Sequence, residues 1–162
     1  MIFPFNAGEV FKLALQLEDN GFRFYEAAAA KPFPAEIKAL FQHLALEEKG
    51  HKAVFTHILS QVPAAAAAAT VWDPDNELDQ YLKMMADQHV FNQAPAELDR
   101  KCAGLADFRE AVRLAMSFEK DSIVFFLELL ALSENNEEGR AEIRKLVDEE
   151  RKHLRKLTRL LK

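Results

Sequence analysis

A glutamate stands three residues before a histidine at two matching places in this chain of 162 residues. The pairs are Glu48 with His51, in the stretch LEEKGH, and Glu150 with His153, in the stretch DEERKH. In a helix, side chains three residues apart share one face, a single turn from each other. Each pair could therefore clamp a metal ion between a carboxylate and an imidazole. One Glu-x-x-His pair is a weak signal in a glutamate-rich chain, but two at matching places are a strong one.

Two further glutamates interrupt stripes of apolar residues that recur at helical spacing. Glu18 lies in a stripe with Leu17 and Phe24, and Glu119 lies in a stripe with Phe118. Burying a carboxylate costs several kcal/mol unless a partner neutralises its charge. Taken alone, Glu18 fits a solvated position at the edge of its stripe equally well. The spacing of Glu18 alone is therefore compatible both with a buried carboxylate and with a solvated one.

Composition and periodicity predict one all-α domain over residues 1–162. Ala, Leu, Glu and Lys dominate, only five glycines and six prolines interrupt the chain, and 49% of the residues are hydrophobic, enough for a sizeable core. The apolar spacing predicts a four-helix bundle of two hairpins joined by a long crossover that carries an extra helix. The predicted helices cover about 6–30, 34–61, 77–92, 107–132 and 137–161, so that hairpin 1 is about 6–61, the crossover about 62–105 and hairpin 2 about 106–162.

The two halves repeat their helix starts as well as their candidate ligands. An offset of 101 residues superposes Asn6 on Asp107, Glu9 on Glu110 and Glu18 on Glu119, and an offset of 102 superposes Glu48 on Glu150 and His51 on His153. An Asn or Asp followed three residues later by Glu is the sequence pattern of a capping box. Each candidate glutamate falls near the middle of its helix. At about 1.5 Å per residue, all four carboxylates are expected within a few Å of one level of the bundle.

Four glutamates and two histidines meeting in a core predict a two-metal site. Four unpaired carboxylates would repel one another strongly, whereas two divalent cations cancel their charge. Oxygen and imidazole ligands without thiolate suit iron, manganese or zinc. Two helices that each supply one Glu, with two that each supply Glu-x-x-His, form the ligand arrangement of ferritin-like di-metal bundles. The predicted ligands are Glu18, Glu48, His51, Glu119, Glu150 and His153.

The chain resembles the rubrerythrin-like branch of the ferritin-like superfamily. The resemblance includes these ligand motifs and the run Leu17-Glu18 followed by residues 24–28 (FYEAA), and it covers nearly the whole chain. It implies that Glu18 and Glu119 are terminal ligands and that Glu48 and Glu150 bridge the metals. One histidine would then serve each metal. It also implies a homodimer and an oxidoreductase that acts on peroxide or O2.

The chain departs from rubrerythrins in two respects. Rubrerythrins carry a cysteine-rich rubredoxin domain that supplies electrons, and this chain has only Cys102. They also have a further glutamate one turn after the third-helix ligand, where Ser122 stands, opposite Gly21 in the first half. An oxidoreductase would therefore need an external electron donor. Non-catalytic iron binding or delivery, and a scaffold that keeps a structural metal, are the alternative functions.

Other side chains near the motifs have simpler interpretations. Tyr25, seven residues after Glu18 on the same face, could donate a hydrogen bond to a ligand, although a core aromatic with its hydroxyl paired is the preferred interpretation. His43, His57 and His89 have no glutamate three residues before them. We expect ordinary helix residues there, rather than an extra ligand or a gate at His89.

Charge and composition exclude several classes of function. A net charge of −5 argues against nucleic-acid binding. The single cysteine excludes a disulfide framework and a cysteine-rich metal site within this chain. No apolar run approaches the roughly 18 residues of a membrane span. These features predict a soluble, cytoplasmic protein without a membrane partner.

Overall fold

The computed structural model describes residues 7–61, 77–90, 92, 94–132 and 137–162, and it is helical throughout those residues, with only turns between the helices. The helices are α1 (Ala7–Ala29), α2 (Ala35–Ser60), α3 (Glu77–Asp87), α4 (Pro95–Ala103), α5 (Phe108–Leu132) and α6 (Glu137–Arg159). The four long helices start and end within about two residues of their predicted bounds, apart from the predicted Asn6 and Glu9 cap, which lies outside the described side chains. The predicted all-α bundle is therefore confirmed.

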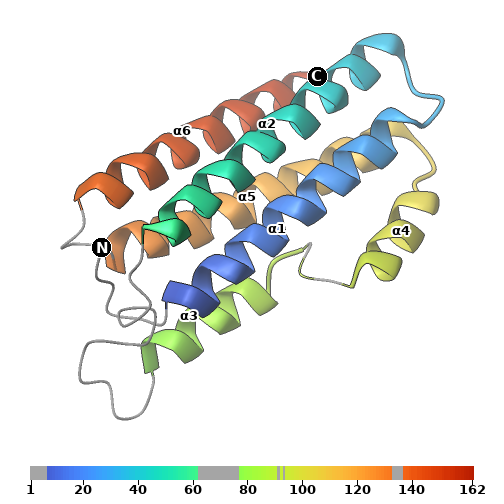
Figure 1. Ribbon diagram of the computed structural model, residues 1–162. Helices are drawn as coiled ribbons and strands as arrows, with labels where there is room; N and C mark the ends of the chain where they lie inside the picture. The colour runs from blue at the N-terminus through green and yellow to red at the C-terminus, as the bar shows by residue number, and fades with distance from the viewer. Residues whose placement is uncertain (1–6, 62–76, 91, 93, 133–136) are drawn as a thin grey trace.

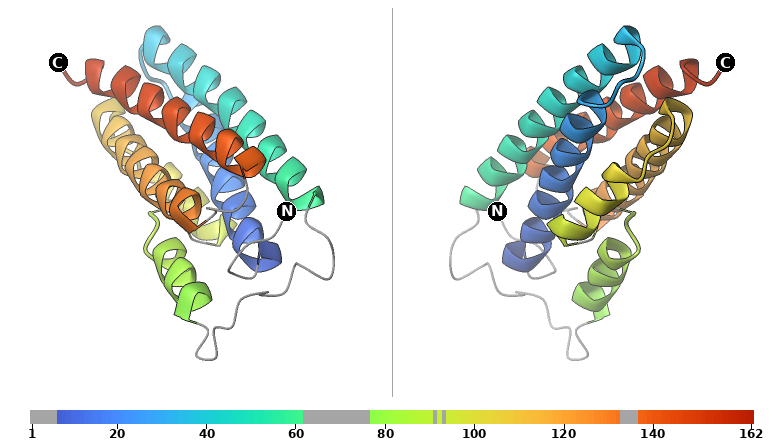
Figure 2. Two further views of the ribbon diagram at one scale, coloured as in Figure 1. Left: turned by 90° about the vertical axis from the view of Figure 1, so that its left-hand side faces the viewer. Right: turned by 90° about the vertical axis from the view of Figure 1, so that its right-hand side faces the viewer.

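The long helices form two antiparallel hairpins that pack side by side (Figure 1). Helix α1 packs along α2, α5 packs along α6, and contacts of α2 with α6 and of α1 with α5 join the hairpins. The crossover helices α3 and α4 lie against the α1 and α5 side of the bundle, away from α2 and α6 (Figures 1 and 2). The two described helices of the crossover thus cover one side of the bundle.

The crossover differs from its prediction in two respects. The helix predicted over about 77–92 ends at Asp87, and a second short helix, α4, begins at Pro95. The sequence pattern identified Pro95 only as a helix breaker. Proline also suits the first turn of a helix, because it has no N–H to leave unpaired there. Pro95 occupies that first position, so the proline that was predicted to break a helix begins one instead.

The predicted start of the second hairpin is confirmed in detail. The Asp107 carboxylate accepts a hydrogen bond from the Glu110 N–H, at 2.9 Å, and the Glu110 carboxylate accepts one from the Ala106 N–H, also at 2.9 Å. Both bonds satisfy backbone donors that precede or begin the helix. The returning bond goes one residue further back than in a standard capping box. The cap fixes where α5 begins, and therefore how far along the helix Glu119 lies.

A polar layer divides the core into two apolar clusters. One cluster contains Val10 to Leu17 of α1 and the apolar residues around Phe55, Phe126 and Leu146. The other contains Phe24 to Ala29 of α1 and the residues around Phe41, Phe118 and Leu157. In every long helix the candidate ligands fall between the segments that belong to the two clusters. The predicted common level of the carboxylates follows from this order.

Close packing at Gly21 gives a prediction for stability. A Cβ added at Gly21 would lie 2.3 Å from Cζ of the buried Phe118 ring, whereas one added at exposed Gly50 would have nothing within 4 Å. Gly21→Ala is therefore expected to destabilise the protein by about 1–2 kcal/mol, because overpacking outweighs the better helix propensity of alanine. Gly50→Ala, the matched control, should stabilise it by up to about 1 kcal/mol. Urea unfolding measures both; equal effects would contradict the close approach of Phe118.

Candidate metal centre

The six predicted ligands come together from four helices at one place in the bundle core. They form two overlapping groups, in each of which the candidate ligand atoms all lie within 4.8 Å of one another. The groups are Glu18, Glu48, His51 and Glu150, and Glu48, Glu119, Glu150 and His153. Glu48 and Glu150 belong to both groups. Their shared position is the one expected of carboxylates that bridge two metal ions.

The candidate ligand atoms of this cluster are buried, and most of them have no hydrogen-bond partner among the described residues. All four glutamates are fully buried, and the two histidines are at most 2% exposed. Seven of the eight oxygens of the four carboxylates have no hydrogen-bond partner among the described residues. The eighth, Oε1 of Glu119, accepts a hydrogen bond from the Tyr25 hydroxyl. Buried polar atoms are rarely left unpaired, so this donor set fits a pair of metal ions.

Both imidazoles present Nδ1 to the carboxylates. His51 Nδ1 lies 2.9 Å from Glu150 and 3.4 Å from Glu18. His153 Nδ1 lies 3.0 Å from Glu150 and 3.3 Å from Glu119. The two rings stack 5.5 Å apart with an interplanar angle of 14°. The centre therefore has an approximate twofold arrangement, with one nitrogen and one unshared carboxylate on each side of the shared pair.

A second pair of glutamates contacts the outer nitrogens of the histidines. Glu149 Oε2 hydrogen-bonds His51 Nε2 at 3.1 Å, and Glu47 Oε2 lies 3.0 Å from His153 Nε2. Each glutamate belongs to the opposite hairpin from the histidine that it contacts. Such outer carboxylates fix the orientation of a ligating imidazole and increase its basicity. Sequence reasoning missed them, although the doubled Glu-Glu in both motifs was a signal.

The outer carboxylates give a prediction for metal affinity. Glu149→Gln and Glu47→Gln are each expected to weaken metal binding by about 10- to 100-fold, because the imidazole loses its orienting carboxylate. Glu142→Gln, on the same helix as Glu149 and 4.0 Å from exposed His57, is the matched control. Competition with a coloured chelator measures the affinities. Equal affinity in all three variants would show that the outer carboxylates do not support the ligands.

Burial and mutual repulsion set the protonation of the metal-free cluster. Burial, followed by the charge of Glu48, raises the pKa of Glu18 well above its ordinary value, and burial likewise raises the pKa of Glu119 and of Glu48. For Glu150, burial acts in the same direction, but His51 and the second imidazole outweigh it, so the pKa of Glu150 is lowered. The metal-free cluster therefore retains protons that bound metal ions would displace.

The histidines of the cluster are the positive partners of Glu150. Burial opposes protonation of both rings, but the Glu150 charge outweighs it at His51, whose pKa lies well above the ordinary value. Contacts with Glu119 and Glu150 raise the pKa of His153 to about 11. Both rings are thus protonated at neutral pH when no metal is bound. In this state the two protonated rings balance part of the negative charge of the carboxylates.

The other side chains considered in the sequence analysis are either buried near the cluster or exposed and outside it. Tyr25 is a buried core aromatic whose hydroxyl is paired, as preferred, but its partner is the candidate ligand Glu119. His43 and His57 are about half exposed and do not belong to the cluster. His89 is buried, and its Nε2 lies 3.1 Å from Oγ of Ser122, the serine that departs from the rubrerythrin pattern.

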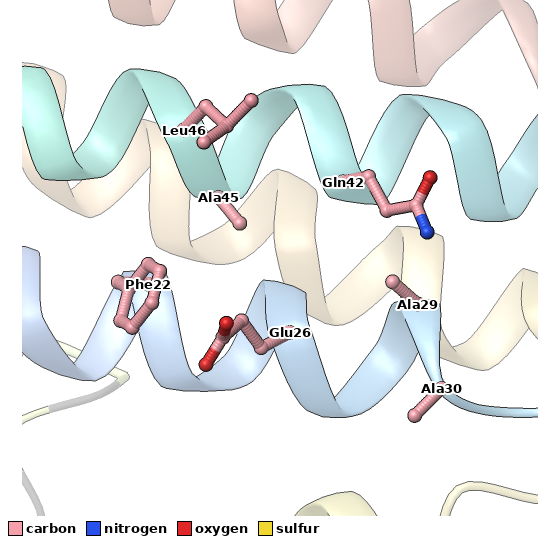
Figure 3. Close-up of a pocket in the computed structure, with 7 residues that line it drawn as sticks. All are labelled: Phe22, Glu26, Ala29, Ala30, Gln42, Ala45 and Leu46. Atoms are coloured by element: carbon pink, nitrogen blue, oxygen red, sulfur yellow. The ribbon is translucent and has the colours of Figure 1, made fainter.

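A hollow of about 510 Å³ between α1 and α2 lies apart from this chemistry (Figure 3). Its lining is Phe22, Glu26, Ala29, Ala30, Gln42, Ala45 and Leu46. None of the six candidate ligands lines it. The size of a hollow is therefore a poor guide to the site in this bundle, where the clustered donor atoms are enclosed in the core.

Comparison with known proteins agrees with this geometry. The Rubrerythrin family profile matches residues 9–161. The chain belongs to the rubrerythrin family. Its structure superposes on the crystal structure of a Thermotoga maritima protein assigned as a ferritin-like diiron-carboxylate protein, with a TM-score of 0.71, 25% sequence identity, and coverage of 99% of this chain and 96% of that chain. No curated protein matches the sequence.

Rubrerythrin-family membership and the buried Glu/His cluster together fit a protein that binds two metal ions. The predicted ferritin-like bundle is confirmed by the structural match. No rubredoxin domain is evident in the match. Among the described residues, no helix of this rubrerythrin-family chain is both long and apolar enough to cross a membrane.

Proposed function

We propose that this protein is a di-iron oxidoreductase that reduces peroxide or O2 with electrons from a separate donor. Glu18 and Glu119 would be terminal ligands, Glu48 and Glu150 bridging ligands, and one histidine would bind each iron. The observation that carries the proposal is the membership of Glu48 and Glu150 in both groups of converging donor atoms. A structural metal needs only one such group, whereas two metals that share carboxylates can act on one substrate together.

The donor set supports iron as the metal. It consists of carboxylates and imidazoles without thiolate, which suits iron, manganese or zinc. Of these three metals, iron is the one that we prefer for O2 or peroxide chemistry. The structurally similar protein from Thermotoga maritima is assigned as a ferritin-like diiron-carboxylate protein. When bound, two ferrous ions would supply the two electrons that peroxide reduction requires.

The surrounding side chains would control ligand geometry and water. The two apolar clusters enclose the centre on both sides, which excludes bulk water and strengthens the electrostatic interactions within it. The Tyr25 hydroxyl orients the carboxylate of Glu119. Glu47 and Glu149 hold the imidazoles from outside. These contacts fix the donor atoms in place before any metal arrives.

The proposal extends to the setting in which the protein works. We infer that residues 1–162 form a single ferritin-like domain, that two chains associate as a homodimer as the family resemblance implies, and that the electron donor is another protein in the cytoplasm. The free thiol of Cys102 is compatible with a reducing compartment. Light scattering of the purified chain tests the dimer.

Anaerobic loading with ferrous iron, followed by a peroxide assay, tests the proposed function. The expected result is two irons per chain and rapid consumption of peroxide, with an absorbance change on oxidation of the iron. Two irons without turnover would instead indicate the iron-binding or delivery function. A metal that raises the melting temperature but supports no reaction would indicate a structural scaffold. No specific metal binding would overturn all three.

A further inference from the structure

A buried histidine outside the proposed ligand set joins the crossover to the metal-bearing helices. His89 follows α3, is 4% exposed, and lies with Nε2 3.1 Å from Oγ of Ser122 on α5. Phe118 packs edge-on against its ring, with centroids 5.3 Å apart. The next residue, Val90, donates its backbone N–H to the Asp121 carboxylate at 2.9 Å. The hydrogen bond and these neighbouring contacts hold the ring in one position.

Ser122 connects this histidine to the level of the metal centre. It is fully buried and lies one helical turn after Glu119, on the same inward face of α5. At about 1.5 Å per residue, its backbone is some 4.5 Å further along the helix than that of Glu119. The contact with Ser122 therefore links the His89 ring to the face of α5 that carries Glu119.

His89 also lines a hollow. The hollow has a volume of about 160 Å³, and its lining is Met85, Gln88, His89, Asp121 and Val124. Gln88 and Val124 are exposed, whereas Ser122 and His89 are buried. A hollow of this size with polar lining can hold several water molecules. His89 therefore contacts a buried serine and also lines a hollow that it shares with exposed side chains.

The chemistry of the pair is more specific than core packing requires. A phenylalanine and an alanine would fill similar volumes without burying an imidazole and a hydroxyl. Burial lowers the pKa of His89 to about 4, so the ring is neutral at pH 7, with one nitrogen as donor and the other as acceptor. A neutral imidazole in contact with a hydroxyl can accept a proton at one nitrogen and release one at the other.

We propose that His89 and Ser122 form a proton relay from the hollow to the substrate held at the metal centre. This inference rests on the proposed function. Reduction of one peroxide consumes two electrons and two protons, breaks the O–O bond and yields two waters, with the electrons supplied by the metal pair and, ultimately, by the external donor. Each proton delivered counts as one pass of the relay. In each pass Ser122 gives its hydroxyl proton to an oxygen of the substrate and takes a proton from His89 Nε2. Water in the hollow protonates the ring, and two passes complete one turnover.

The relay requires a particular tautomer of His89. Nε2 must carry the proton, so that it donates to Ser122 and leaves the serine hydroxyl directed elsewhere. Nitrogen-15 NMR of the zinc-loaded full chain, with the signal assigned by its loss in His89→Gln, is expected to show Nε2–H at neutral pH. An Nδ1–H tautomer would overturn the relay, because the serine proton would then point at the ring.

Stopped-flow oxidation of the ferrous protein by peroxide completes the test. His89→Gln and Ser122→Ala are each expected to slow oxidation by about 100-fold, the usual contribution of a positioned proton donor, with two irons still bound. His57→Gln, which changes an exposed histidine, should leave the rate unchanged. Added imidazole should partly restore His89→Ala.

The outcomes separate the relay from the proposed function. Native rates in His89→Gln and Ser122→Ala, with only a lower melting temperature, would overturn the relay and leave the di-iron function in place. A loss of iron in these variants would also overturn it, because the pair would then support the ligands. Native protein that binds iron but is not oxidised by peroxide would overturn the proposed function, and the relay with it.

Discussion

The Glu48→Ala/Glu150→Ala protein is expected to bind no iron, where the native chain is expected to bind two per chain. Both glutamates belong to both groups of donor atoms, so their removal leaves each metal position with one carboxylate and one histidine. Two ligands from protein cannot compete well with water for a divalent ion. Iron content after anaerobic loading and desalting measures the effect.

Variants of the terminal ligands provide the matched comparison. Glu18→Ala removes a donor from one group only and should reduce the content to about one iron per chain, as should Glu119→Ala. Glu142→Gln, on the same helix as Glu150 but outside both groups, should retain two. If the bridging double variant keeps even one tightly bound iron, the shared roles of Glu48 and Glu150 are wrong.

The metal-free protein is expected to become less stable as the pH rises from about 5 to 8. Glu18, Glu48 and Glu119 have raised pKa values when folded, against an ordinary value of 4.5, and the pKa of His51 is raised above 6.5. Groups with raised pKa values bind more protons in the folded chain than in the unfolded chain. Stability is then greatest below the unfolded values and falls as the pH rises through the folded ones.

Each extra proton held by the folded chain changes the stability by about 1.4 kcal/mol per pH unit, or roughly 3–6 °C in melting temperature per unit for a protein of this size. The lowered pKa of Glu150 acts only below this window. The lowered pKa of His89, about 4, opposes the slope by one proton below about pH 6.5, where the raised pKa values of the three glutamates outweigh it. Calorimetry of the chelator-treated protein at several pH values measures this change in melting temperature.

Bound metal should reverse this dependence. Metal ions must displace the retained protons, so the gain in melting temperature on adding metal should grow with pH. Glu48→Gln/Glu150→Gln, which removes two ionisable carboxylates from the cluster but keeps their shape, should flatten the slope of the metal-free form. A metal-free native protein that gains stability between pH 5 and 8 would contradict the raised pKa values.

Patterns among residues close together in the sequence predicted most of the candidate site. Helical spacing placed Glu48 beside His51, and the offset between the two halves paired Glu18 with Glu119 before any contact was known. The cap at Asp107 fixed the start of α5 and hence the height of Glu119. These features depend on residues within a few turns of each other, which is why a sequence pattern could predict them.

Contacts between residues far apart in the sequence could not be predicted from such patterns. His89 was predicted to be an ordinary helix residue, because no glutamate stands at the clamp spacing before it. Its partner Ser122 is 33 residues away, and only the path of the crossover brings them together. Glu47 and Glu149 were visible in the motifs, but their contacts with histidines of the opposite hairpin depend on how the hairpins dock. Pro95 was predicted to break the helix over about 77–92, but that helix ends earlier, at Asp87, and Pro95 begins α4.

The four long helices, their phase and the common level of four carboxylates and two imidazoles could be predicted from the sequence alone, because periodicity and capping are properties of neighbouring residues. Only the tertiary structure decided which glutamates belong to both groups of donor atoms, which carboxylates contact the histidines from outside, and where the crossover places His89. Those relations join residues 33 to 132 positions apart, and the packing of two hairpins and a covering crossover sets them.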